Sequence, residues 1–133
     1  MSFDCRAWHA VASELVSGTP TAGLEEAYWR TAVGRSYYCV YGLASRLLFF
    51  EGIPAQNLDT HTVVREKFLY HREKTRKLVG ERLRRLYSER EKADYRYCDT
   101  VSKKQAEATL ATAEETIGLL DTLLQPYRDR PIS

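Results

Sequence analysis

Apolar residues recur at helical spacing along most of the chain, and this pattern predicts helices. The first apolar stripe predicts a short helix that ends near Gly18. It consists of Phe3, Ala7, Trp8, Val11 and Leu15. The following segment, 19–23, contains proline and glycine and reads as a loop.

From 24 to 50 no proline interrupts the pattern, which predicts one long helix. Its apolar and aromatic residues fill two stripes. One stripe is Leu24, Tyr28, Tyr38 and Phe49, and the other is Val33, Tyr37, Val40, Ala44, Leu47 and Leu48. A helix that is apolar on more than one face is typically central in its fold and buried on several sides. Gly34 and Gly42 lower helix propensity, so we expect a close contact with another helix at each of them.

The second half of the chain predicts three more helices. Asp59 or Thr60 caps the first of them, and the charged segment 71–75 separates it from the next. Ser102 and Gln105 form a capping-box pattern that starts the last helix. The residues expected to face the core are Val63, Val64, Phe68, Leu69, Leu78, Val79, Leu83, Leu86, Tyr87, Ala93, Ala106, Leu110, Ala113, Ile117, Leu120 and Leu124.

These elements predict an all-α antiparallel bundle of four main helices and a short N-terminal one. The length of 133 residues fits a single domain, with a core over about 24–125 and a loose tail at 128–133. Hydrophobic residues make up 44% of the chain and charged residues 29%, which argues against a disordered protein.

Neither a membrane-spanning stretch nor a secretory signal stands out, so we expect a soluble, cytoplasmic protein without a membrane partner. Cys5, Cys39 and Cys98 include no CxxC pair. The three histidines are not at metal-ligand spacing. We therefore expect no disulfide framework, no metal and no cofactor.

The net charge of +2 is unevenly distributed. The segment 65–96 holds 12 Lys or Arg and 6 Asp or Glu, a net charge of +6, while each flank carries −2. Such a segment fits a phosphate-facing surface, with Arg84 and Arg85 as candidate RNA contacts, or a docking face for an acidic partner. A plain solvated helix face is the alternative.

Three polar residues stand where a simple core is not expected to have them. Arg35 lies in the long helix, so it needs either an internal carboxylate partner on the charged helix or a role at a site. Arg90 continues an apolar face, and an ion pair with Asp94 one turn on is its structural explanation. His61 stands just inside a helix start, where a capping or packing role competes with a catalytic one.

Three segments together resemble the prokaryotic HEPN domains, small helical proteins often encoded beside minimal nucleotidyltransferases. They are Gly34-Arg35-Ser36-Tyr37-Tyr38, Thr60-His61 and Arg90-Glu91-Lys92-Ala93-Asp94-Tyr95. The resemblance covers about 24–125. It implies a helical bundle that forms a homodimer, often with a composite cleft at the interface. Many members are metal-independent endoribonucleases, including toxins of toxin–antitoxin pairs and effectors of phage defence.

The family signature is an arginine followed, after four to six residues, by a histidine. Arg90 matches the arginine, but Tyr95 stands where the shortest spacing puts the histidine. A histidine titrates near neutral pH, whereas a phenol with a pKa of about 10 is a poor general base. Some toxin members carry Arg-x4-His-x-Tyr, whose tyrosine receives AMP from the partner nucleotidyltransferase, and Tyr97 falls on that position.

Two functions follow from the resemblance. In the first, the chain is a ribonuclease or toxin, with Arg90 on the phosphate and Tyr95, with Asp94 or His61, in the cleft. In the second, it is a non-catalytic module that binds nucleotide, RNA or a nucleotidyltransferase antitoxin. On an ideal helix Tyr95 lies about 140° around from Arg90. We therefore expect the two to converge only if the helix bends near Ala93 or a dimer mate supplies one of them.

Overall fold

The structure is a computed structural model that describes residues 3–58 and 60–128. In this part of the chain every regular element is helical. The α-helices are α1 (Arg6–Ser17), α2 (Glu25–Phe50), α3 (His61–Leu69), α4 (Lys74–Tyr95) and α5 (Lys103–Leu124), and the short 3-10 helices are η1 (Ala55–Leu58) and η2 (Gln125–Tyr127). The predicted all-α fold class is confirmed. Apart from Arg128, the predicted loose tail lies outside the described residues.

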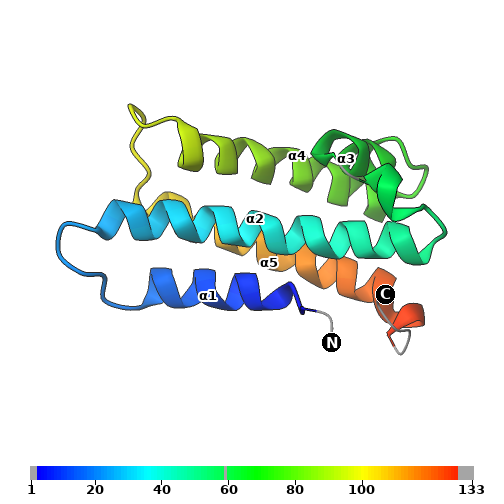
Figure 1. Cartoon of the computed structure of the whole chain (residues 1–133), viewed down its shortest axis with the longest axis horizontal. Helices are drawn as coiled ribbons and strands as arrows, with labels where there is room; N and C mark the ends of the chain where they lie inside the picture. Colours follow the sequence, from blue (N-terminus) through cyan, green and yellow to red (C-terminus); the bar gives the residue numbers. More distant parts are fainter. Residues whose placement is uncertain (1–2, 59, 129–133) are drawn as a thin grey trace.

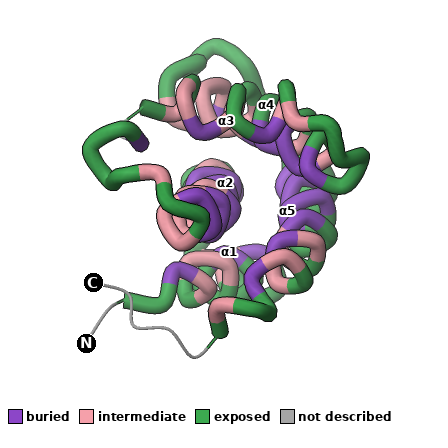
Figure 2. The backbone as a smooth tube through the Cα atoms, turned by 90° about the vertical axis from the view of Figure 1, so that its right-hand side faces the viewer, coloured by how far each residue is buried: buried purple, intermediate pink, exposed green. Residues whose placement is uncertain are grey.

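Helix α2 is the centre of the bundle. In Figure 1, α4 with α3 lies on one side of α2, α1 lies on the other, and α5 runs behind. The chain direction alternates along α1, α2, α4 and α5, so sequential long helices are antiparallel. Seen from the end, these helices surround α2 on all but one side (Figure 2). On that side the segment that joins α2 to α3 lies beside the C-terminal end of α2, where the Tyr41 hydroxyl donates to the Leu58 carbonyl oxygen.

Local capping chemistry fixes the helix starts. The Thr60 side chain accepts a hydrogen bond from the Val63 amide at 3.1 Å, which makes Thr60 the cap of α3. The alternative cap, Asp59, lies outside the described residues. Ser102 and Gln105 form both hydrogen bonds of the predicted capping box, at 3.1 and 2.8 Å. The break before α4 is shorter than predicted, because α4 already begins at Lys74.

The core follows the second predicted stripe of α2. Every residue of that stripe is buried, from Val33 to Leu48. The first stripe is not buried, since Leu24 is 49% exposed and Tyr38 is half-buried. Most inward-facing residues predicted in α3, α4 and α5 are buried as well; those that are only half-buried are Val63, Leu69, Leu78, Tyr87 and Ile117.

The predicted face of α1 was wrong. Phe3 and Val11 are 57% and 45% exposed, whereas the small residues Ala12 and Val16 of α1 are buried. Small side chains let α1 approach α2 closely. A Cβ on Gly42 of α2 would lie 3.1 Å from both Cβ and Sγ of Cys5, so the close contact predicted at Gly42 is confirmed.

The other predicted glycine contact, at Gly34, has only ordinary spacing. A Cβ there would lie 3.5 Å from Asp94 Oδ1. The tightest helical contact is instead at Gly80 of α4, where a Cβ would lie 2.5 Å from the backbone nitrogen of Leu69 in α3. Gly80 therefore fixes how closely α3 sits on α4.

Within the described residues, the helices are too short or too polar to cross a bilayer.

Candidate functional site

Arg90 is the hub of a polar cluster between α2 and α4. Its Nη2 donates a hydrogen bond to the Tyr38 hydroxyl at 2.7 Å. Its Nε lies 2.9 Å from Asp94 Oδ2 in an ion pair, without the alignment of a hydrogen bond. The guanidinium also lies 5.2 Å from the centre of the Tyr38 ring and 5.4 Å from that of Tyr95. The i,i+4 pair with Asp94 is thus present, but it is only one of the contacts of Arg90.

His61, the first residue of α3, lies in an aromatic cluster. Its Nδ1 is 2.5 Å from the Tyr37 hydroxyl. The ring centres of Tyr41, Tyr87 and Tyr38 lie 4.4, 5.4 and 6.0 Å from that of His61. We call Tyr37, Tyr38, Tyr41 and Tyr87 the tyrosine cluster.

Burial and two cations control the protonation of His61. Burial lowers the pKa of His61, and the charges of Arg90 and Arg65 lower it further. The imidazole is therefore neutral at pH 7. Burial also raises the pKa of Tyr37, so its phenol keeps its proton. The hydrogen bond between them joins a neutral imidazole to a neutral phenol.

Tyr38 connects Arg90 with His61. Arg90 binds its hydroxyl, and His61 packs against its ring. Residues from α2, α3 and α4 are thereby brought to one place, although they are distant in sequence. In such a pair the guanidinium can bind an anion, and the neutral imidazole can accept a proton from a group attached to that anion.

A carboxylate partner was one of two alternatives for Arg35, and the described residues do not supply it. Among the described residues no carboxylate forms an ion pair with Arg35. Its guanidinium instead lies 4.6 Å from the centre of the Trp8 ring and 5.1 Å from that of Tyr38. The physical reason is its surroundings: Arg35 is half-buried, and its neighbours are the aromatic rings of Trp8 in α1 and Tyr38 in α2. Arg35 therefore extends the site from Tyr38 toward α1.

Tyr95 reaches Arg90 without the predicted bend. Helix α4 is continuous through Ala93 to Tyr95, and the contact is made within one chain. The long, flexible arginine side chain covers the angular separation that an ideal helix places between the two residues. Tyr95 is 61% exposed and lies at the outer edge of the cluster. Tyr97 lies beyond the end of α4 and is 80% exposed.

Sequence reasoning missed Arg30, which holds the last turn of α4. Its Nη1 donates to the carbonyl oxygens of Lys92 and Ala93 at 3.1 and 2.9 Å. Its Nη2 donates to those of Arg96 and Asp99. The Lys92 carbonyl also accepts the amide of Arg96, which ends α4, and Arg30 adds further donors to the helix end that carries Asp94 and Tyr95. No local pattern in the sequence could have revealed contacts to a segment so distant along the chain.

The basic segment 65–96 does not form one uniform surface. Arg84 and Arg85 are exposed and help line an open depression of about 680 Å³. They lie about 120–140° around α4 from Arg90, so the structure does not bring them to the tyrosine cluster. Arg76 is buried, and its guanidinium binds both carboxylate oxygens of Glu51. Arg76 therefore belongs to the fold rather than to a binding surface.

Nowhere in the described part of the chain do three or more His, Cys, Asp or Glu side chains gather so that they could hold a metal ion.

The comparison with protein families matched the HEPN domain over residues 22–123. Neither the curated proteins nor the solved structures included a match to the chain.

Proposed function

The chain belongs to the HEPN domain family, and from this premise we propose that it is a metal-independent endoribonuclease of a toxin–antitoxin or phage-defence system. The observation that supports the proposal is the meeting of Arg90 and His61 at Tyr38. Attack of a ribose 2′-hydroxyl on a phosphodiester needs a group that takes the hydroxyl proton and a group that balances charge on the phosphate.

In the proposed reaction the 2′-oxygen bonds to the adjacent phosphorus, and the bond from phosphorus to the 5′-oxygen of the next nucleotide breaks. His61 accepts the 2′-hydroxyl proton at Nε2, in the tautomer whose Nδ1–H donates to the Tyr37 oxygen. Its lowered pKa keeps the ring able to accept that proton at pH 7. Arg90 binds the phosphate oxygens, and the 5′-oxygen leaves with a proton from water. The products are a 2′,3′-cyclic phosphate and a 5′-hydroxyl.

The remaining site residues act around this pair. Asp94 orients Arg90 through their ion pair. Tyr95 offers an exposed ring against which a base can stack. Arg35 adds a second cation beside Tyr38, toward α1. Tyr97 is exposed, as an acceptor of AMP from a nucleotidyltransferase antitoxin needs to be.

A homodimer is part of the proposal. HEPN domains often dimerise, and a second copy is the partner that we propose for the uncovered side of α2 (Figure 2). Arg35 and the cluster members Tyr38 and Tyr41 are half-buried residues of α2. A partner that covers them would exclude water from the site and strengthen its electrostatic interactions.

Tyr95 favours a second candidate function. It occupies the place of the signature histidine, so the chain is alternatively a non-catalytic module that binds nucleotide, RNA or a partner nucleotidyltransferase. In that case Arg90 binds a phosphate and no bond is broken.

Incubation with single-stranded RNA in excess EDTA tests the proposed reaction. We expect fragments that end in 2′,3′-cyclic phosphate, while an all-deoxy strand of the same sequence stays intact because it lacks the attacking hydroxyl. The rate should fall as the pH is lowered through the pKa of His61, which lies below the ordinary value of about 6.5. RNA that is bound but never cleaved would contradict the ribonuclease and support the binding module.

RNA binding should depend on Arg84 and Arg85. If they contact phosphates, the affinity falls steeply with salt through counterion release, and Arg84→Glu with Arg85→Glu makes the logarithmic salt slope shallower by about 1.4. The matched control reverses Lys103 and Lys104, two adjacent exposed cations at the start of α5. Fluorescence anisotropy over a salt series measures both variants. If both charge reversals weaken RNA binding equally, Arg84 and Arg85 contribute only through the overall positive charge of the surface and not through specific phosphate contacts.

A further inference from the structure

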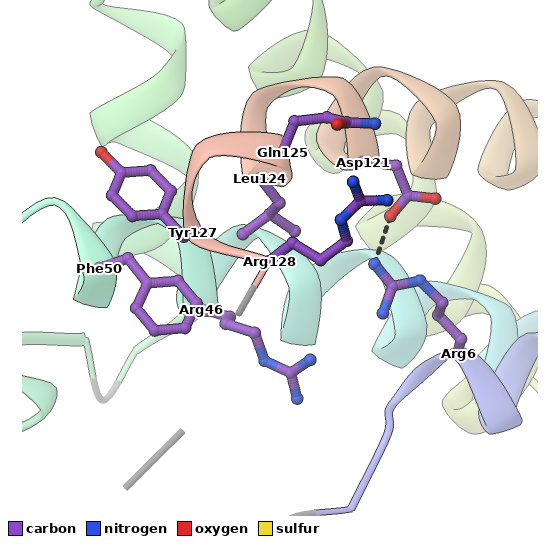
Figure 3. A pocket seen from close by; sticks show the side chains of 8 residues that line it. All are labelled: Arg6, Arg46, Phe50, Asp121, Leu124, Gln125, Tyr127 and Arg128. Atoms are coloured by element: carbon purple, nitrogen blue, oxygen red, sulfur yellow. Dashed lines mark hydrogen bonds and ion pairs between the residues drawn. The ribbon is translucent and has the colours of Figure 1, made fainter. Parts of the chain in front are cut away.

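A pocket separate from the tyrosine cluster lies where the first turn of α1 meets the C-terminal ends of α2 and α5 (Figure 3). Its volume is about 370 Å³. Sites for small molecules range over about 300–1,000 Å³, so the pocket has the size of a small ligand. It shares no residue with the tyrosine cluster or with Arg90.

The pocket carries an excess of positive charge. Arg6, Arg46 and Arg128 line it together with a single carboxylate, that of Asp121. Arg6 binds Asp121, as the dashed line in Figure 3 marks. In contrast, neither Arg46 nor Arg128 forms an ion pair with any described residue.

The charge of Arg46 acts on its surroundings. Its Nη2 donates to the Phe3 carbonyl oxygen at 3.2 Å. The pKa of the neighbouring Cys5 thiol is lowered to about 7, first by a hydrogen bond from Cys39 and then, against burial, by the charges of Arg46 and Arg6. Since Arg46 has no carboxylate partner among the described residues, an anion in the pocket would balance its charge.

The wall opposite the Arg6–Asp121 pair is aromatic. The rings of Phe50 and Tyr127 stack with their centres 5.4 Å apart and an angle of 11° between their planes. Figure 3 shows this stack on one side of the pocket and the Arg6–Asp121 pair on the other, with Arg46 and Arg128 between them. The pocket thus joins an apolar, flat wall to two guanidiniums.

We propose that this pocket binds a phosphate monoester attached to a flat ring system, of the size of a nucleoside monophosphate. Arg46 and Arg128 bind the phosphate, for which the planar guanidinium fork offers paired hydrogen bonds. The ring system packs against Phe50 and Tyr127. The proposal does not depend on RNA cleavage, because it concerns other residues at another place in the bundle.

Titration calorimetry with AMP tests the pocket in the full chain. We expect saturable binding with a dissociation constant below about 1 mM. Arg46→Gln and Arg128→Gln should each weaken binding about tenfold, since each removes a charge-assisted hydrogen bond. Lys104→Gln removes an exposed cation at the start of α5, outside the pocket, and should leave the affinity for AMP unchanged. Adenosine, without the phosphate, and inorganic phosphate, without the ring, should both bind more weakly than AMP.

Three results would overturn the proposal. One is the absence of saturable AMP binding at millimolar concentration. Another is an equal loss in Lys104→Gln, which would assign the binding to general surface charge. The third is inorganic phosphate that binds as tightly as AMP, because the aromatic wall then contributes nothing. This last comparison uses the wild-type protein alone, so it holds even where a variant fails to fold.

Discussion

Gly80→Ala should lower the free energy of unfolding by about 3 kcal/mol, a cost at the upper end of that for overpacking a core. A Cβ at this position would lie 2.5 Å from the backbone nitrogen and 2.8 Å from the Cα of Leu69. Both are backbone atoms, so no side-chain rotation relieves the clash. Helix α3 must move away from α4, and the buried side chains Val64 and Phe68 lose part of their packing. Urea denaturation measures the loss.

Gly118→Ala is the matched control. Gly118 is exposed in α5, and a Cβ there would meet nothing within 4 Å. Alanine in an open helical position favours the helix, so this variant should gain about 0.5–1 kcal/mol. The two substitutions add the same methyl group and should change stability in opposite directions. A Gly80→Ala protein as stable as the wild type would mean that α3 is not held tightly against α4.

The elements that the sequence predicted well are those with local causes. The capping box of Ser102 and Gln105 and the Thr60 cap depend on residues three positions apart, so their pattern is visible in the chain. The second stripe of α2 is buried as helical periodicity predicts, but the same periodicity also marked the first stripe, which is exposed or half-buried. The face of α1 was missed because it is set by its neighbour: Ala12 and Val16 belong to the same buried cluster as Trp29, Ala32 and Val33 of α2, and the sequence of α1 alone does not show this contact.

In the candidate site, too, the contacts with local causes could be predicted and those set by helix packing could not. The ion pair of Arg90 with Asp94 spans one helical turn and was visible in the sequence. The partners of Arg90 and His61 on α2, Tyr38 and Tyr37, were not, because they depend on how three helices pack. The tyrosine-rich long helix was the available signal, but tyrosines at helical spacing are as typical of a core as of a site.

Arg90→Ala should abolish RNA cleavage or toxicity, with a loss of about 100-fold or more, as when a group that stabilises transition-state charge is removed. Its side chain is 12% exposed and that of Asp94 is 33% exposed. Loss of Arg90 removes this ion pair and the hydrogen bond to Tyr38, so it should cost about 2 kcal/mol of stability. A thermal melt beside a cleavage assay therefore separates the two effects, because a protein that remains folded at the assay temperature has lost function for a chemical reason.

Two further variants distinguish phosphate binding by Arg90 from a purely structural pair. Asp94→Asn removes the carboxylate and keeps Arg90 with its hydrogen bond to Tyr38. This variant should therefore retain most of the cleavage and lose less stability than Arg90→Ala, about 1 kcal/mol. Tyr95→His places an imidazole at the signature position, beside the Arg90 guanidinium, and should leave cleavage intact or raise it. If Asp94→Asn is as inactive as Arg90→Ala, or if Arg90→Ala unfolds, the ion pair itself is what matters. Arg90 then belongs to the fold and not to the catalytic pair, whereas a wild-type protein that cleaves no RNA would make the non-catalytic binding module the better account of this HEPN protein.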